Sequence, residues 1–138
     1  MRIDEPVPEE SVIRFEGGLP GFGDLRRFLL LEPEELGPVV LLQSLDDEHV
    51  SIPLAPVRSV APDYELRVSA GGLRALGAET VDEVVGFAVL VLPAAQGPAG
   101  CNLLAPIVLN PRTRLASQVL QSWSDYPAFH PLPEEQPC

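Results

Sequence analysis

The hydrophobic residues of this 138-residue chain occur in short runs separated by turn-forming residues, a pattern typical of strands. Polar and apolar positions alternate in residues 11–16 and 64–69, so every second side chain there is expected to face a core. Sixteen prolines and eleven glycines separate the runs at close spacing, which disfavours long helices. We therefore predict an all-β chain that folds as one antiparallel, β-barrel-like domain with one or two short helices.

Two apolar runs, residues 28–31 and 39–42, are continuous and predict strands that are buried on both faces. Residues 49–54 predict a shorter strand, which Pro53 would confine to a sheet edge because proline lacks the amide donor of the ladder. Three further strands are expected, at residues 84–92, 102–109 and 114–121. The last of these also fits a helix.

One short helix is predicted to begin at Ser69 or Gly71 and to end before Gly77, a residue type favoured just beyond helix ends. Leu73 and Leu76 would share its buried face.

A single domain is expected over residues 1–130, followed by a mobile tail of proline and glutamate over residues 131–138. The N-terminus is acidic and lacks the apolar stretch of a signal peptide, and the longest apolar run is too short for a membrane span. We expect a cytoplasmic monomer without membrane contact. Cys101 and Cys138 are expected to be reduced thiols, with Cys101 a buried or half-buried structural thiol.

The charge is strongly negative: twenty acidic residues oppose nine arginines and no lysine, for a formal net charge of −11. Nucleic-acid binding needs clustered cations that replace phosphate counterions, and the densest cationic stretch here is the pair Arg26 and Arg27. Direct nucleic-acid binding is therefore not expected. The charge favours a basic protein partner, although it also fits a surface that is acidic only for solubility.

The glycine-rich stretch FEGGLPGFGD at residues 15–24 raises the question of a phosphate site. It lacks the third glycine of a dinucleotide fingerprint, and the chain has no lysine for a P-loop. Pro20 followed by Gly21 instead fits the two central positions of a type II turn. We expect this loop to reverse the chain and to bind no cofactor.

No catalytic or metal-binding motif stands out. His49 and His130 are the only histidines and lack neighbouring ligands at metal spacing, and no nucleophile-elbow motif is present. We expect a protein that is not an enzyme. One alternative is a hydrolase that uses His130 with Asp125 or Ser124, which would require a pocket around these side chains.

Several separated stretches match one family in its order along the chain. They are IRFEGGLPGF, VVLLQSL, APDYEL and NLLAPIVLNPRTRLASQVL, followed by Tyr126 and His130-Pro131-Leu132. Together they span roughly residues 11 to 132, and NLLAPIVLN is the most specific of them. On these residues the chain resembles the FliW family of bacterial flagellar assembly factors.

This resemblance implies a barrel-like β fold, no catalysis and two protein partners, flagellin and the RNA-binding translational repressor CsrA. Free flagellin would occupy the factor. After flagellin is exported, the factor would capture CsrA and would affect the RNA site of CsrA from a distance. The acidic charge of the chain suits a cationic, RNA-binding partner. The alternative from another class is a small acidic adaptor or structural barrel without a flagellar role.

We expect acidic loops to steer CsrA and a more apolar patch to bind flagellin. The candidate loop residues are Glu32, Glu34, Glu35, Asp46, Asp47 and Glu48. The candidate apolar contacts are Leu19, Phe22 and Trp123, although a core position is also open for Phe22 and Trp123. The motif residues expected to shape the scaffold are Phe15, Gly18, Pro20, Gly21, Gln43, Asp63, Tyr64, Asn102, Pro106 and Asn110. Among them, Gln43, Asn102 and Asn110, together with Gln118, are expected to bond backbone groups where strands meet loops.

Overall fold

A computed structural model of the protein describes residues 8–21, 25–91 and 99–132. Its strands are β1 (Ile13–Arg14), β2 (Arg27–Leu31), β3 (Val40–Ser44), β4 (Ser51–Pro56), β5 (Val85–Val91), β6 (Gly100–Asn110), β7 (Leu115–Gln118) and β8 (His130–Pro131). Two short α-helices, α1 (Val57–Val60) and α2 (Ala70–Ala75), and three 3₁₀ turns, η1 (Glu9–Ser11), η2 (Glu34–Leu36) and η3 (Val81–Glu83), complete the described elements.

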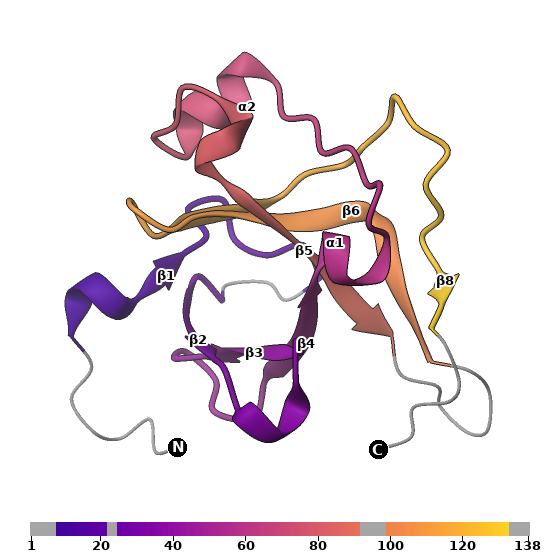
Figure 1. Cartoon of the computed structure of the whole chain (residues 1–138). Helices are drawn as coiled ribbons and strands as arrows, with labels where there is room; N and C mark the ends of the chain where they lie inside the picture. The colour runs from indigo at the N-terminus through magenta and orange to yellow at the C-terminus, as the bar shows by residue number, and fades with distance from the viewer. Residues whose placement is uncertain (1–7, 22–24, 92–98, 133–138) are drawn as a thin grey trace.

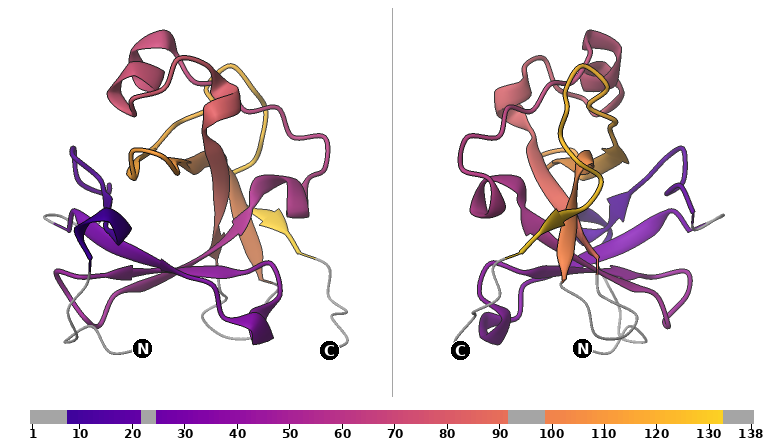
Figure 2. Two further views of the ribbon diagram at one scale, coloured as in Figure 1. Left: turned by 60° about the vertical axis from the view of Figure 1, so that its left-hand side comes forward. Right: turned by 90° about the vertical axis from the view of Figure 1, so that its right-hand side faces the viewer.

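The strands form one sheet in the order β5-β4-β3-β2-β1-β7-β6-β8, and a further pairing of β5 with β6 closes the first seven strands into a barrel. All neighbouring pairs are antiparallel except β1 and β7, which run parallel. Strands β2–β4 lie at one end of the molecule and α2 at the other in every view (Figures 1 and 2). The prediction of an all-β, barrel-like fold with two short helices is confirmed.

The barrel interior is filled by apolar side chains that alternate along the strands. Phe15 and Phe28 meet edge to face with their ring centres 5.3 Å apart, and each side chain is at most 1% exposed. The expectation that the apolar run of β3 is buried on both faces is wrong. Val40, Leu42 and Ser44 are buried while the residues between them are half-exposed, since a closed barrel covers only the inner face of each strand.

Pro53 does not mark an edge strand, because β4 lies between β3 and β5. It pairs with Leu41 of β3, whereas the pairing with β5 begins one residue later, at Leu54. Pro53 therefore stands at the end of the β4–β5 ladder, where a missing amide donor can be accommodated.

The predicted helix is present as α2. The Ser69 hydroxyl accepts a hydrogen bond from the amide of Gly72 at 3.0 Å and caps its first turn. Gly77 follows with a φ of 74°, and a Cβ there would lie 2.7 Å from Cγ2 of Thr113, so both conformation and space require glycine. Residues 114–121, whose pattern also fits a helix, contain β7.

Residues 64–69 are extended but pair with no strand, contrary to the sequence-based expectation. The burial alternates as predicted, with Tyr64 buried and Leu66 and Val68 partly buried. Side chains of residues 119–127 take the place of a neighbouring strand and bond this backbone.

The glycine-rich loop turns the chain at Pro20 and Gly21, and the φ of +90° at Gly21 is the positive value that a type II turn needs. At the other end, β8 crosses the domain boundary predicted at residue 130. Leu132 packs on the core cluster around Tyr64, so the described domain continues to Leu132. Within the described residues, no helix is long and apolar enough to cross a bilayer.

Candidate protein-binding surfaces

The loop between β2 and β3 carries three of the predicted partner-binding acids. Glu32, Glu34 and Glu35 are exposed, and no ion pair among the described residues involves them. Pro33 precedes η2 and Gly37 follows it with a φ of 64°, which holds the acids on one compact turn. Leu36, on the same turn, is 41% exposed. The loop therefore offers free carboxylates beside an apolar group.

The loop between β3 and β4 uses most of its acids for its own structure. Asp46 accepts bonds at Oδ2 from the backbone amides of Arg26 and Arg27, at 3.0 and 3.1 Å, and at Oδ1 from Nε of Arg27 at 3.3 Å. Asp47 accepts from the amide of His49 at 3.0 Å. Glu48 lies 3.9 Å from the imidazole of His49. Sequence alone could not tell these structural carboxylates from those of the first loop.

The pKa of Asp46 reflects this bonding. Partial burial is the largest single influence and opposes the charge, but the hydrogen bonds from Arg26 and Arg27 together outweigh it and lower the pKa. Asp46 is therefore a carboxylate held in place by its own chain. The sequence analysis grouped Asp46 with Asp47 and Glu48 as partner contacts, but Asp46 is less available to a partner than this grouping implied.

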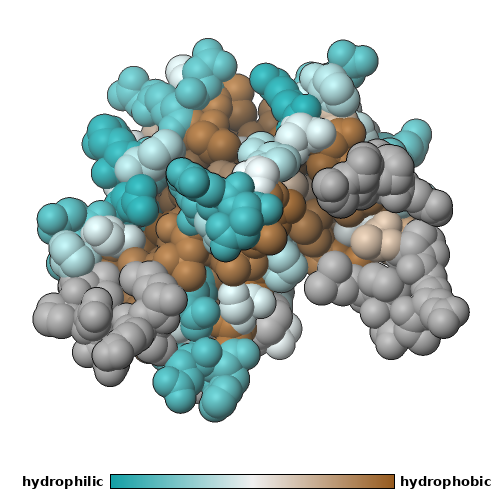
Figure 3. All heavy atoms as spheres, turned by 60° about the horizontal axis from the view of Figure 1, so that its bottom comes forward, coloured by the Kyte–Doolittle hydropathy of each residue, from teal (hydrophilic) through white to brown (hydrophobic). Residues whose placement is uncertain are grey.

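The two acidic loops lie at opposite ends of β3, because one precedes Val40 and the other follows Ser44. They do not form one continuous acidic patch at a single strand end. Seen from the side of β2–β4, the molecule carries hydrophobic residues in the middle of this face and hydrophilic residues around them (Figure 3).

A second surface is built by the C-terminal segment, residues 119–127, which bridges β6 and the extended residues 64–68. Gln121, fully buried, bonds the backbone of Arg67 twice: its Oε1 accepts from the amide at 2.9 Å and its Nε2 donates to the carbonyl at 2.8 Å. The Tyr126 hydroxyl accepts from the amide of Glu65 at 2.8 Å. Side chains thus bond the backbone of this segment where no strand is available.

Aromatic residues of this segment form a stack that ends at the surface. Tyr126 stacks on Tyr64 with ring centres 4.2 Å apart, and Trp123 meets Tyr126 edge to face at 5.8 Å. The guanidinium of Arg67 lies 4.0 Å over the Trp123 ring. Trp123 is 43% exposed and Leu120 is 59% exposed. Trp123 is therefore a partly covered surface aromatic rather than a core residue, and Leu120 is an exposed apolar residue of the same segment that the sequence analysis did not name.

The strongest family stretch, NLLAPIVLN, forms an irregularity in β6. Phe87 pairs with Ile107 but Val89 pairs with Asn102, so β6 holds extra residues at this point. The Asn102 side chain accepts bonds from the amides of Leu104 and Ala105 at 2.9 and 3.1 Å, which closes the irregular turn.

Hydrogen bonds to backbone carbonyls fasten the same irregularity to Tyr64 and to residues 118–121. The Tyr64 hydroxyl donates to the carbonyl of Leu103 at 2.5 Å, and the side-chain amide of Gln118 donates to the carbonyl of Ala105 at 3.0 Å. The amides of Val119 and Gln121 donate to the carbonyls of Pro106 and Leu104, respectively, at 2.9 and 2.7 Å. The motif residues Tyr64, Asn102 and Pro106 therefore lie where three parts of the chain meet.

Burial raises the pKa values of two groups at this junction above their ordinary values. It is the main cause that raises the pKa of Tyr64 to about 12, with smaller contributions from Tyr126 and Cys101. It also raises the pKa of the Cys101 thiol, which is fully buried as predicted. Cys138 lies outside the described residues.

The remaining motif residues act at several places. Asn110 donates to the carbonyl of Leu76 at 2.8 Å and so ties the end of β6 to α2. The Gln43 amide donates to the carbonyls of Ser44, Glu48 and Val50. Phe15 lies in the core; Gly18, with a φ of 80°, and Pro20 and Gly21 shape the loop after β1; Asp63 is exposed in the turn before Tyr64.

Two predicted apolar contacts do not contribute to a described surface. Leu19 is 4% exposed and packs in the barrel core, so its side chain is not available to a partner in this conformation. Phe22 lies outside the described residues. For Leu19, the positive φ of Gly18 turns the chain back so that the next side chain points inward.

The residues of the hydrolase alternative have other roles in the structure. The Ser124 hydroxyl donates to the carbonyl of Gln121 at 2.7 Å and accepts from the amide of Tyr126 at 3.2 Å, as a turn residue does. His130 lies in β8, opposite Cys101. Within residues 8–21, 25–91 and 99–132, no group of three potential ligands comes together around a metal position.

Comparison with known proteins places this fold in a family. The sequence matches the model described as FliW protein over residues 4–132. Flagellar assembly factor FliW of Thermotoga neapolitana is 38% identical over 130 residues, which cover 94% of this chain and 87% of the relative, and that of Thermotoga maritima is 35% identical over the same shares. A crystal structure of the flagellar assembly factor FliW matches with a TM-score of 0.84 at 30% identity, covering 96% of this chain and 93% of the solved one. The chain therefore belongs to the FliW family.

Proposed function

We propose that this protein is a non-enzymatic, cytoplasmic flagellar assembly factor that binds flagellin and antagonises the translational repressor CsrA by exchanging one partner for the other. Family membership supports the assembly role, because relatives that match over most of their length are named flagellar assembly factors. The observation that carries the choice of a cationic partner is the turn with three exposed glutamates that no described cation neutralises.

CsrA binds through the loop between β2 and β3 in this proposal. Glu32, Glu34 and Glu35 attract a basic surface and raise the association rate, since exposed charges act mainly on encounter and specificity. Leu36 then enters the interface core and contributes apolar contact area. The loop between β3 and β4 contributes less, because the carboxylate of Asp46 already has its partners.

Flagellin binds through the aromatic surface of the C-terminal segment. Trp123 and Leu120 present apolar area, and the stack with Tyr126 limits the motion of the indole before binding. An amphipathic helix of the cargo fits such a patch, because its apolar stripe needs an apolar partner. Flagellin at this surface would then weaken CsrA at the distant loop through the shared scaffold.

Isothermal titration calorimetry with purified CsrA and flagellin from the same organism tests the proposal. We expect each to bind one copy per chain, and flagellin to displace or weaken CsrA. The CsrA affinity should fall as salt rises, because charges are screened beyond about 8 Å at physiological ionic strength. Failure of both proteins to bind would contradict the proposal and favour an acidic adaptor without a flagellar role.

A further inference from the structure

The outer face of the barrel carries two arginines directly opposite each other. In the β1–β2 ladder Ile13 pairs with Phe28 and Arg14 pairs with Arg27. Ile13 and Phe28 are buried in the core, so the arginines, one residue along, face outward. Side chains of a directly opposed pair start about 4.5–5.5 Å apart.

This pairing is unfavourable by itself, because like charges directly opposite on neighbouring strands repel each other. It is also improbable by composition in a chain with nine arginines and twenty acids. Each arginine has one described acidic partner: Arg14 pairs with Glu9, and Arg27 with Asp46. A guanidinium has five N–H donors, so each side chain, 38% and 48% exposed, retains donors for another group.

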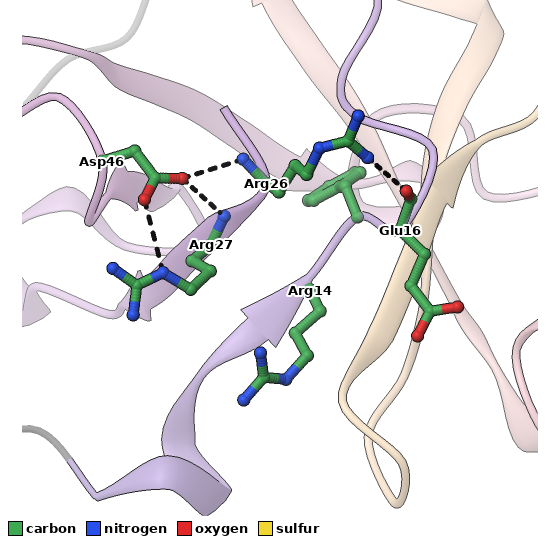
Figure 4. A pocket seen from close by; sticks show the side chains of 6 residues that line it. Arg14, Glu16, Arg26, Arg27 and Asp46 are labelled. Carbon is green, nitrogen blue, oxygen red and sulfur yellow. Dashed lines mark hydrogen bonds and ion pairs between the residues drawn. The ribbon is translucent and has the colours of Figure 1, made fainter. Parts of the chain in front are cut away.

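The pair borders a pocket of about 390 Å³ (Figure 4). The carboxylates on its rim do not fill it. Both oxygens of Asp46 are taken by Arg26 and Arg27, and the side chain of Glu16 points away from Arg26, whose guanidinium bonds the Glu16 backbone carbonyl instead. Each arginine thus has one carboxylate partner and keeps N–H donors that this partner does not use.

Two further arginines lie beside Arg14. Arg14 also lines a second pocket together with Arg112, Arg114 and the acidic residues Glu9 and Glu10. The side-chain bond of Arg114 is a long one, 3.5 Å from Nη2 to the carbonyl of Ser11, and its Nε has no hydrogen-bond partner among the described residues. Arginines therefore continue from β2 across β1 to the turn before β7, with acidic residues between them.

We propose that the Arg14–Arg27 pair is a carboxylate-binding site that holds an acidic side chain of a protein segment docked across β1 and β2. Guanidinium groups bind carboxylates with two parallel hydrogen bonds, and an anion between the two arginines removes their repulsion. Local sequence choices that oppose stability are expected at functional sites. A nucleic acid fits less well, because a chain of net charge −11 repels a long polyanion whereas one carboxylate meets only the local charge.

Fluorescence anisotropy with a labelled hexaglutamate peptide tests this site at physiological salt, where distant acids are screened. We expect hexaglutamate to bind and hexaglutamine not to bind. Arg14→Gln should weaken hexaglutamate binding about tenfold, as expected for the loss of one charge-assisted contact, and Arg14→Lys should weaken it less. The matched control is Arg74→Gln on the exposed face of α2, which removes the same charge and should change binding less than twofold.

The thermal midpoint of Arg14→Gln should stay close to that of the unchanged chain, because the relieved repulsion with Arg27 offsets the lost ion pair with Glu9. An unchanged midpoint separates lost binding from lost folding. Three results would overturn the site: no binding of hexaglutamate, equal losses for Arg14→Gln and Arg74→Gln, or tighter binding of a hexauridylate than of hexaglutamate. None of these bears on CsrA or flagellin, so the function proposed above is tested separately.

Discussion

Strands β2–β4 and the C-terminal segment are held in place in different ways. Consecutive backbone ladders join β2, β3 and β4, so any side chain of suitable size and polarity preserves their pairing. Residues 64–68 have no such ladder and depend on the side chains of Gln121 and Tyr126 for their backbone bonds. The first region tolerates substitution, whereas the second is fixed by individual residues.

The same difference separates the two proposed surfaces. The acids between β2 and β3 project from a turn that needs none of them for its bonds, so their number can vary without cost to folding. Trp123, in contrast, donates from its indole N–H to Gln121 at 3.0 Å and belongs to the network that closes the fold. The aromatic surface therefore includes a side chain that also holds the fold together, whereas the carboxylates of the acidic turn have no such second role.

The largest expected effect comes from Gln121→Ala. This substitution leaves two part-buried backbone groups of Arg67 without their partners and empties a fully buried side-chain position, which together cost about 3 kcal/mol of unfolding free energy. The matched control is Gln118→Ala, which removes one bond, to the carbonyl of Ala105, and should cost about 1 kcal/mol. Urea unfolding measures both. Equal losses would show that Gln121 has no special part in closing the fold.

Tyr64→Phe comes next. It keeps the stack on Tyr126 but leaves the buried carbonyl of Leu103 without its donor, at an expected cost of about 1–2 kcal/mol. Tyr126→Phe removes a bond to the exposed Glu65, whose amide water can satisfy, and should cost less than about 1 kcal/mol. The reverse order in urea unfolding would contradict the role of the Tyr64 hydroxyl in fastening the β6 irregularity.

The smallest effect is a pH dependence on the side of β2–β4. The pKa of Asp46 is lowered in the folded chain, so its carboxylate adds stability above its unfolded pKa of about 3.9, and this contribution is lost as pH falls through the folded pKa. Asp46→Asn should therefore cost less than about 1 kcal/mol at pH 7, as for other exposed ion pairs, and progressively less below pH 4. A cost that grows toward low pH would contradict this sign.

The same contrast explains what could be predicted from the sequence. Alternation and turn residues located most strands and α2, because these signals are local. The place of β4 inside the sheet, the parallel contact of β1 with β7 and the buried position of Leu19 depend on how the barrel closes, which no local pattern encodes. The role of Gln121 had only a weak signal, a polar residue directly after the apolar Val119 and Leu120. The separation of the acidic loops, by contrast, follows once β3 is known to be a strand between them.

The central claim is that two separate surfaces serve two partners, and parallel affinity measurements on two variants test it most directly. Glu32→Gln, Glu34→Gln and Glu35→Gln combined should leave the stability within about 0.5 kcal/mol, since they are exposed and unpaired among the described residues. This variant should slow CsrA association about tenfold at low salt and leave flagellin binding unchanged. Trp123→Ala should weaken flagellin binding about tenfold or more and leave CsrA binding unchanged. Leu120→Ser is a second variant of the same surface that does not remove the indole bond to Gln121. If both variants weakened both partners equally, or neither partner at all, the division between the two surfaces would be contradicted.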